Sequence, residues 1–100
     1  MQEAVRKLSK LPAANLKLQK RGELKGGNYA DIVIFDPEAT MTISSKTHHS
    51  KVDYSLFEGR EVTGVPITVL SRGVPVIENR ILVGKRGAGQ FIKRHQYQLV

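Results

Sequence analysis

The sequence predicts a mainly β fold in which short N-terminal helices precede antiparallel strands. Helical spacing of apolar residues is confined to the start of the chain, where Ala4, Val5, Leu8 and Leu11 fall on one stripe. Short runs of apolar and β-branched residues follow, and turn-forming residues separate them. We therefore expect one or two helices, about five short strands and an extended tail.

The helical segment is expected to end in two steps. Pro12 ends the first helix, because the residue before a proline is pushed out of the α region. The same proline can open a second short helix through Leu16 and Leu18, with Ser9 as a candidate cap. No helical partner follows, so we expect the apolar stripe to pack against a body outside this segment.

The clearest strand is predicted over residues 30–35, where an unbroken apolar run is typical of burial on both faces. Asp36 and Pro37 are expected to close this strand. The other predicted strands cover residues 41–44, 62–65, 67–70, 74–77 and 81–83.

The connections carry their own signals. Tight turns are predicted at residues 72–73 and 79–80, and Pro75 between them indicates an edge strand or a bulge. Residues 45–59 show no periodicity, and a loop of this length usually has a function or packs on another surface. The glycine-containing basic tail is expected to be extended and to need a surface to lie on.

Composition excludes several classes of protein. The chain has 100 residues and no cysteine, which excludes a disulfide framework, cysteine-ligated zinc and thiol catalysis. No apolar run approaches the roughly 18–20 residues that span a bilayer, and the N-terminus lacks the apolar core of a signal peptide. We expect a cytoplasmic protein with no membrane partner.

The net charge of +7 raises the question of nucleic acid. The positive residues gather at 6–25 and 80–94, without interleaved aromatic residues or a recognisable binding motif. A solvated surface, or one that meets an acidic partner, is the preferred interpretation. We expect no nucleic-acid partner.

His48 and His49 are the most conspicuous candidates for a metal or acid–base site. Adjacent histidines in an extended loop project to opposite sides, and nothing fixes the geometry of Asp53 and Glu58 nearby. Hydrogen bonding within the loop, or an interface, is the preferred interpretation. A catalytic role for His95, in the tail, is weaker still.

Asp31 and Asp36 bracket the clearest strand and are expected to point to opposite faces, so they do not form a catalytic pair. We expect Asp31 to accept hydrogen bonds from the preceding glycine-rich turn, and Asp36 to start the turn completed by Pro37. No phosphate loop and no nucleophile elbow is present. The residues alone therefore predict no catalytic, cofactor-binding or metal-binding residue.

Residues 21–36, RGELKGGNYADIVIFD, resemble the pattern G-x-I-x-x-G-x-x-A-D-h-h-h-h-D, with h apolar, found near the C-terminus of amidohydrolase-superfamily enzymes. Further matches are similar to the C-terminal region of dihydropyrimidinases and hydantoinases. These cover residues 42–50, 52–59, 61–66, 71–73 and 87–92. Leu11-Pro12-Ala13 departs from the Asn-Pro-Ala that is frequent in the family, which leaves the substrate open.

The resemblance implies a parent enzyme with a (β/α)8 barrel and a small β-sandwich built from both chain ends. Two divalent metals, usually zinc, would activate a bridging hydroxide that attacks the amide carbonyl of a cyclic substrate. Their ligands belong to the barrel strands, and none maps onto this chain. The resemblance implies a structural and oligomer-contact role, with this chain alone inactive as a hydrolase.

The implied layout has three parts. Residues 1–20 form a helical segment that packs on the barrel, residues 21–84 form the sandwich strands and the long loop, and residues 85–100 form an extended tail. The expected partners are the remainder of the barrel and further copies in a homotetramer. Two alternatives stay open: a non-enzymatic dihydropyrimidinase-like scaffold, and a basic nucleic-acid-binding domain.

Overall fold

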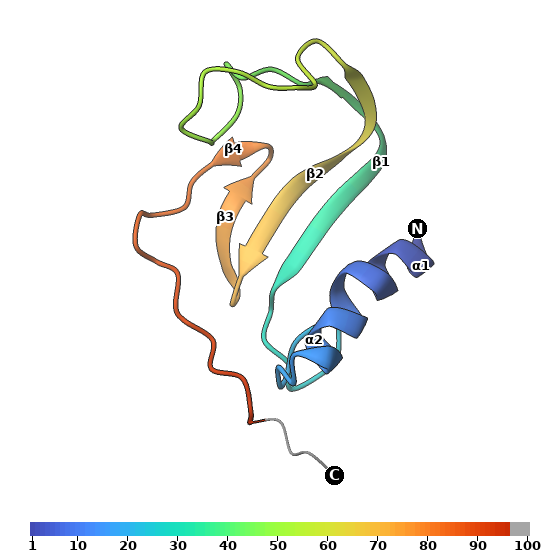
Figure 1. The fold of residues 1–100 in the computed structure, drawn as a ribbon, viewed down its shortest axis with the longest axis vertical. Coiled ribbons are helices and arrows are strands. Elements are labelled where there is room, and N and C mark those ends of the chain that lie inside the picture. Colours follow the sequence, from blue (N-terminus) through green and yellow to red (C-terminus); the bar gives the residue numbers. More distant parts are fainter. Residues whose placement is uncertain (97–100) are drawn as a thin grey trace.

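The structure, a computed structural model, describes residues 1–96 and confirms the mainly β fold with a helical N-terminal segment (Figure 1). Its single antiparallel sheet has the strand order β1-β2-β3-β4, so each strand pairs with its neighbour in sequence. The helical segment lies alongside β1, and the tail runs down the other side of the sheet (Figure 1). The strands are β1 (Ile32–Thr42), β2 (Glu61–Ser71), β3 (Val74–Glu78) and β4 (Ile81–Leu82).

The helical segment continues through Pro12, and the prediction that Pro12 ends a helix is wrong. Helix α1 (Gln2–Val5) leads into the π-helical turn η1 (Arg6–Lys10) and then α2 (Leu11–Asn15), with Pro12 in the first turn of α2. The wider π turn lets the Leu11 amide bond to the carbonyl of Arg6 just before the proline, which has no N–H to donate. Ser9 lies inside η1 and caps nothing there.

The end of α2 turns the chain back toward the helix. Lys17 adopts a left-handed φ of 53°, and the amide of Leu18 donates to the carbonyl of Ala13 at 2.9 Å, as in a Schellman motif. The second helix therefore ends before Leu18. Gly22 then passes so close to the helix that a Cβ at this position would lie 2.6 Å from the Ala13 Cβ.

Strand β1 does not close at Asp36 and Pro37, as the sequence had suggested. The Asp36 Oδ1 atom accepts hydrogen bonds from the amides of Glu38 and Ala39, at 2.9 and 3.2 Å, so this carboxylate does organise a local turn. The turn forms a bulge within the strand, and pairing with β2 resumes at Thr40.

The remaining predicted strands are found with fewer breaks. Residues 41–42 of the predicted strand 41–44 form the end of β1, and residues 62–65 and 67–70 belong to one strand, β2, which runs through Pro66. Proline is tolerated there because the register between β1 and β2 shifts beside it. The six segments predicted as strands thus contribute to four strands, against the expected number of about five.

Both short turns are confirmed. Arg72 and Gly73 have φ of 49° and 79°, and Asn79 and Arg80 have φ of 48° and 67°. Two successive positive φ angles are typical of the type I′ turns that match the twist of β-hairpins. Pro75 lies beside a register irregularity between β2 and β3, which confirms the predicted bulge.

The described residues form very little core of their own. Ala13 and Val65, 7% and 4% exposed, are the buried hydrophobic side chains among residues 1–96. The chain exposes 8766 Å², whereas a compact monomer of 11.1 kDa exposes about 5,700 Å². Its radius of gyration is 16.0 Å, against about 13 Å for a compact domain of this length. Large apolar side chains, which normally lie in a protein interior, contribute to this exposed surface.

Gly64 provides a test of the curved β1–β2 pair. It has φ of +96°, and a Cβ there would lie 2.6 Å from Cζ of the Phe35 ring, so we expect Gly64→Ala to destabilise the sheet by about 1–3 kcal/mol. Gly26→Ala is the matched control, because nothing lies within 4 Å of that position. Urea unfolding followed by circular dichroism would measure both. Equal midpoints for the two variants would contradict this account.

Candidate interaction surface

An apolar groove of about 890 Å³ separates the helical segment from β1. On the helical side, Val5 and Leu8 of the predicted stripe line it, and Leu8 is 81% exposed. On the sheet side, Val33 and Phe35 line it and are also exposed. All four side chains are at least 40% exposed, so the groove is a surface of the kind that normally meets another protein body.

Polar contacts at one end join the helical segment to the connection that leads from it to the sheet. The Ser9 hydroxyl donates to the carbonyl of Gly22 at 3.3 Å, and the Lys10 ammonium lies 3.0 Å from a Glu23 carboxylate oxygen. The hydrogen bond and charge of Lys10 lower the pKa of Glu23. The helix is therefore attached through its last turns rather than through its apolar stripe, and the stripe stays open.

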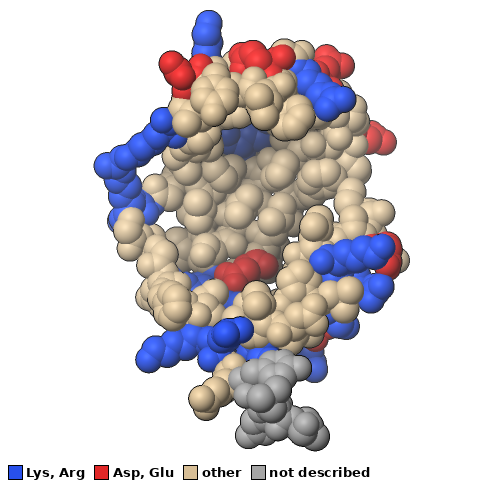
Figure 2. All heavy atoms as spheres, viewed as in Figure 1, with Lys and Arg blue, Asp and Glu red and all other residues tan. Residues whose placement is uncertain are grey.

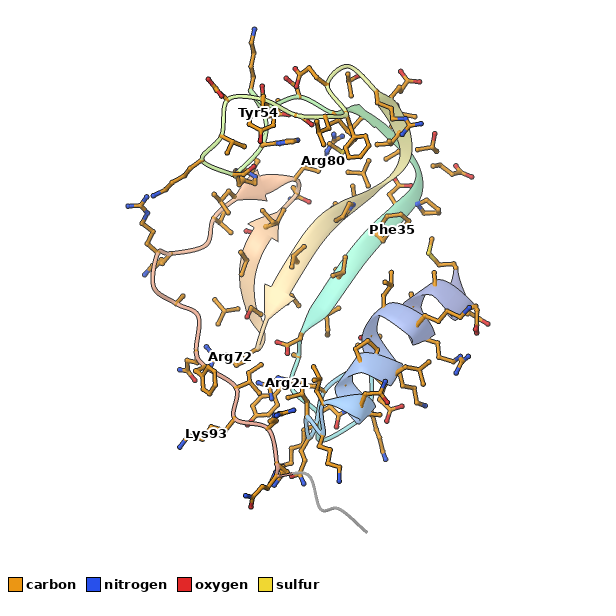
Figure 3. All side chains as sticks on the ribbon, in the orientation of Figure 1. Arg21, Phe35, Tyr54, Arg72, Arg80 and Lys93 are labelled. Carbon is orange, nitrogen blue, oxygen red and sulfur yellow. The ribbon has the colours of Figure 1, made fainter. Side chains whose placement is uncertain are left out.

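Asp31 connects three segments that are distant in sequence. Its Oδ1 accepts a hydrogen bond from the amide of Arg72 at 2.8 Å, and its Oδ2 lies 3.4 Å from the Nε of Arg21. The sequence had suggested bonds to the preceding glycine-rich turn, but the partner is the β2–β3 turn. Figure 3 shows Arg21 and Arg72 at the same end of the sheet, where the tail passes.

The loop between β1 and β2, residues 43–60, is anchored by Glu58. Its carboxylate accepts hydrogen bonds from the hydroxyl of Ser44 at 2.8 Å and the amide of Ser45 at 2.6 Å. The hydrogen bond from the Ser45 amide is the main cause that lowers the pKa of Glu58, and His48 adds a smaller effect. The predicted absence of regular structure over residues 45–59 is confirmed.

The loop presents exposed apolar side chains. Tyr54, Leu56 and Phe57 are all exposed, and Leu56 is 88% exposed. Tyr54 lies at the opposite end of the sheet from Arg21 and Arg72 (Figure 3). Figure 2 shows charged side chains mainly around the rim of this face, with other residues across most of its middle.

The predicted histidine candidates are not brought together with other ligands. Within residues 1–96, no group of three or more His, Cys, Asp or Glu side chains could hold a metal ion. His48 and His49 lie in the β1–β2 loop, and His95 lies in the extended tail. The described residues therefore do not fit the pair of zinc ions that the family resemblance implies.

Arg21, Tyr29 and Arg72 are the residues that the sequence analysis missed. The Arg21 guanidinium stacks on the Tyr29 ring, 4.1 Å from its centroid, and Arg72 donates from its Nη2 to the carbonyl of Ala88 at 3.1 Å. At Arg72 the sequence predicted a tight turn but no contact of the side chain. Nothing local distinguishes Arg21 from the neighbouring solvated cations.

Comparison with known proteins shows which family this chain resembles. The amidohydrolase family matches residues 1–63. A D-hydantoinase from Geobacillus stearothermophilus is 50% identical over 78 residues, which cover 78% of this chain and 17% of that protein. A dihydropyrimidinase from Rattus norvegicus is 47% identical over 78 residues, which cover 78% of this chain and 15% of that protein.

Solved structures agree with the sequence matches. The dihydropyrimidinase from Brevibacillus agri NCHU1002 superposes with a TM-score of 0.80 at 42% identity, over 92% of this chain and 20% of that one. The D-hydantoinase from Bacillus sp. AR9 gives a TM-score of 0.78 at 46% identity, over 88% of this chain and 20% of that one.

The chain therefore belongs to the amidohydrolase family, and it corresponds to part of a hydantoinase or dihydropyrimidinase. It spans about a sixth of the length of the curated relatives it matches. Among the described residues, no helix is long and apolar enough to cross a membrane.

The Glu58 anchor predicts a pH response of the loop. Because the folded loop lowers the pKa of Glu58, its stabilising effect is present above the ordinary glutamate value of 4.5 and is lost as pH falls below it. We expect hydrogen exchange at the Ser45 amide, corrected for intrinsic rate, to lose protection in that acidic range. The Glu58→Gln variant should show no such acid step. An identical acid step in both proteins would assign it to another group.

Proposed function

We propose that this chain is the C-terminal β-sandwich portion of a metal-dependent hydrolase that acts on C–N bonds of cyclic amides. Its role is structural: it packs on a catalytic barrel and contributes oligomer contacts. One observation carries the proposal. The chain exposes 8766 Å², against about 5,700 Å² for a compact monomer of its mass, and its relatives are about five times longer.

The groove supports the barrel as the covering body. Burial of apolar surface stabilises an assembly by roughly 25 cal/mol per Å². Leu8, Val33 and Phe35 present such surface on both walls of the groove. A body that fills the groove would join the helical segment and the sheet through one continuous apolar contact.

The unpaired edge of β1 supports a second contact. β1 is the first strand in the sheet order, so one of its edges has no strand partner within residues 1–96. An eleven-residue edge strand with exposed Val33, Ile34 and Phe35 is normally paired or covered, because a bare edge promotes aggregation. A strand from the rest of the enzyme would complete the sheet as a composite sandwich.

The chemistry of the assembled enzyme belongs to the barrel. In this proposal two zinc ions held there supply the hydroxide for amide hydrolysis. In this proposal residues 1–96 contribute no zinc ligand. The exposed loop residues Tyr54, Leu56 and Phe57 and the tail are the proposed contacts with neighbouring subunits.

The first test concerns the isolated chain. We expect it to bind a hydrophobic dye and to self-associate, because its groove and loop expose interior-like surface. Dye fluorescence and light scattering, with 11.1 kDa as the monomer mass, would measure both. A compact monomer that does not bind the dye would show that the exposed surface needs no partner, and the proposal would fail.

A pair of variants separates the two proposed surfaces. Leu8→Ser, in the groove, should weaken association with a separately expressed barrel by about tenfold, because it removes an exposed leucine that the barrel would bury. Leu56→Ser, in the loop, should leave that association intact and reduce the assembly of complete subunits instead. Calorimetry and sedimentation would measure the two effects. The reverse pattern would exchange the assignments and contradict the proposed layout.

The second test concerns activity. The isolated chain with added zinc should not hydrolyse dihydrouracil or a hydantoin, whereas the chain assembled with its barrel should do so and should contain zinc. Turnover by the purified chain alone would overturn the structural role. An assembled protein that binds no zinc yet forms tetramers would instead be a non-enzymatic scaffold.

A further inference from the structure

A second, smaller cavity lies at the end of the sheet where the tail crosses. It has a volume of about 230 Å³ and is lined by Arg21, Tyr29, Arg72 and tail residues 90–93. Arg21 and Tyr29 also line the apolar groove, so this pair forms a wall between the two cavities. The tail is held over the cavity by the hydrogen bond from Arg72 to the carbonyl of Ala88.

Arg21 is the unusual residue in this cavity. Its side chain is only 15% exposed, and its buried Nε atom has no hydrogen-bond partner within residues 1–96. The closest carboxylate oxygen, Asp31 Oδ2, is an ion-pair contact at 3.4 Å. The ring of Tyr29 covers one face of the guanidinium but accepts no conventional hydrogen bond.

A guanidinium in this environment needs an acceptor. It carries five N–H donors in a planar fork, and leaving donors of a buried charged group unsatisfied is costly. Asp31 fills this role only in part: its Oδ2 lies 3.4 Å from Nε without a hydrogen bond, and its Oδ1 accepts the amide of Arg72 at 2.8 Å. Asp31 also lines the apolar groove and is not among the lining residues of the smaller cavity.

The charges of the cavity define what would bind. Arg72 brings a second guanidinium, and Lys93 lines the tail side, so the cavity walls carry cations and no carboxylate. The volume is smaller than the 300–1,000 Å³ typical of sites for drug-sized ligands. A carboxylate or phosphate group matches both the charge and the fork geometry of arginine.

We propose that this cavity is an oxyanion-binding site in which Arg21 and Arg72 hold a carboxylate or phosphate group beneath the tail. The anion completes the hydrogen bonding of Arg21 and fixes the tail against the end of the sheet. Two sources fit this chemistry: a free small anion, or an acidic side chain of a neighbouring protein body.

The test follows the Nε–H signals of Arg21 and Arg72 by nuclear magnetic resonance, on the full chain below the concentration at which it self-associates. Acetate, inorganic phosphate and chloride are titrated at matched ionic strength. We expect saturable shifts of the Arg21 signal with acetate or phosphate and none with chloride. Shifts that are linear and equal for all three salts would overturn the proposal.

Two lysine variants sharpen the result. Arg21→Lys keeps the charge but loses the fork, so we expect the affinity, followed at Arg72, to fall by about tenfold or more. Arg86→Lys is the control, since this tail residue does not line the cavity. Dispersed backbone amides of β1 and β2 would show that each variant retains the sheet. Equal anion affinity in all three proteins would contradict a role for Arg21.

The same titration on the assembled enzyme distinguishes the sources. If a free anion is the ligand, the saturable shift persists after assembly. If an acidic side chain of a neighbouring body fills the cavity, the Arg21 signal is already shifted and no longer responds to added anion. This readout is independent of the association measurements above, so failure of the oxyanion site and failure of the structural role can be told apart.

Discussion

The position of the helical segment depends on the Asp31 carboxylate. One of its oxygens bonds to the β2–β3 turn and the other pairs with Arg21, in the segment that leaves the helix. Two backbone bonds reinforce this junction, from the amide of Gly73 to the carbonyl of Ala30 and from the amide of Tyr29 to that of Lys20. The junction sets the spacing between helix and strand, and so creates both the apolar groove and the smaller cationic cavity.

Local patterns predicted the elements well where one short-range rule applied. The turns at 72–73 and 79–80 and the bulge at Pro75 follow from turn and proline chemistry alone. The breaks predicted at Pro12, Pro37 and Pro66 are absent. A π turn and two register irregularities accommodate these residues, which lack an amide hydrogen to donate. Such compensation depends on the neighbouring turn or strand, which a linear reading of the sequence does not contain.

Some features of the candidate surfaces could be predicted from local sequence patterns, and others could not. The open stripe at Val5 and Leu8 was foreseeable, because helical spacing showed an apolar face with no partner downstream. The partner of Asp31 was not, since Arg72 lies 41 residues away and only the folded sheet brings it near. The burial of Arg21 likewise arises from Tyr29 and the tail. Arg21 lies in a basic stretch of the sequence, where no local pattern predicts that it is buried. Family resemblance supplied the larger context that residue chemistry alone did not.

The strand order has a consequence for how such a segment is made. Every strand pairs with the next one in sequence, and the longest connection between these four strands is the loop over residues 43–60. Contacts that close short loops lose little chain entropy and form quickly. The sheet can therefore form before it packs against the rest of the enzyme. Assembly would then consist of the association of surfaces that are already folded. Until that association, the apolar groove and loop would be exposed, and a chaperone would be needed most in this interval.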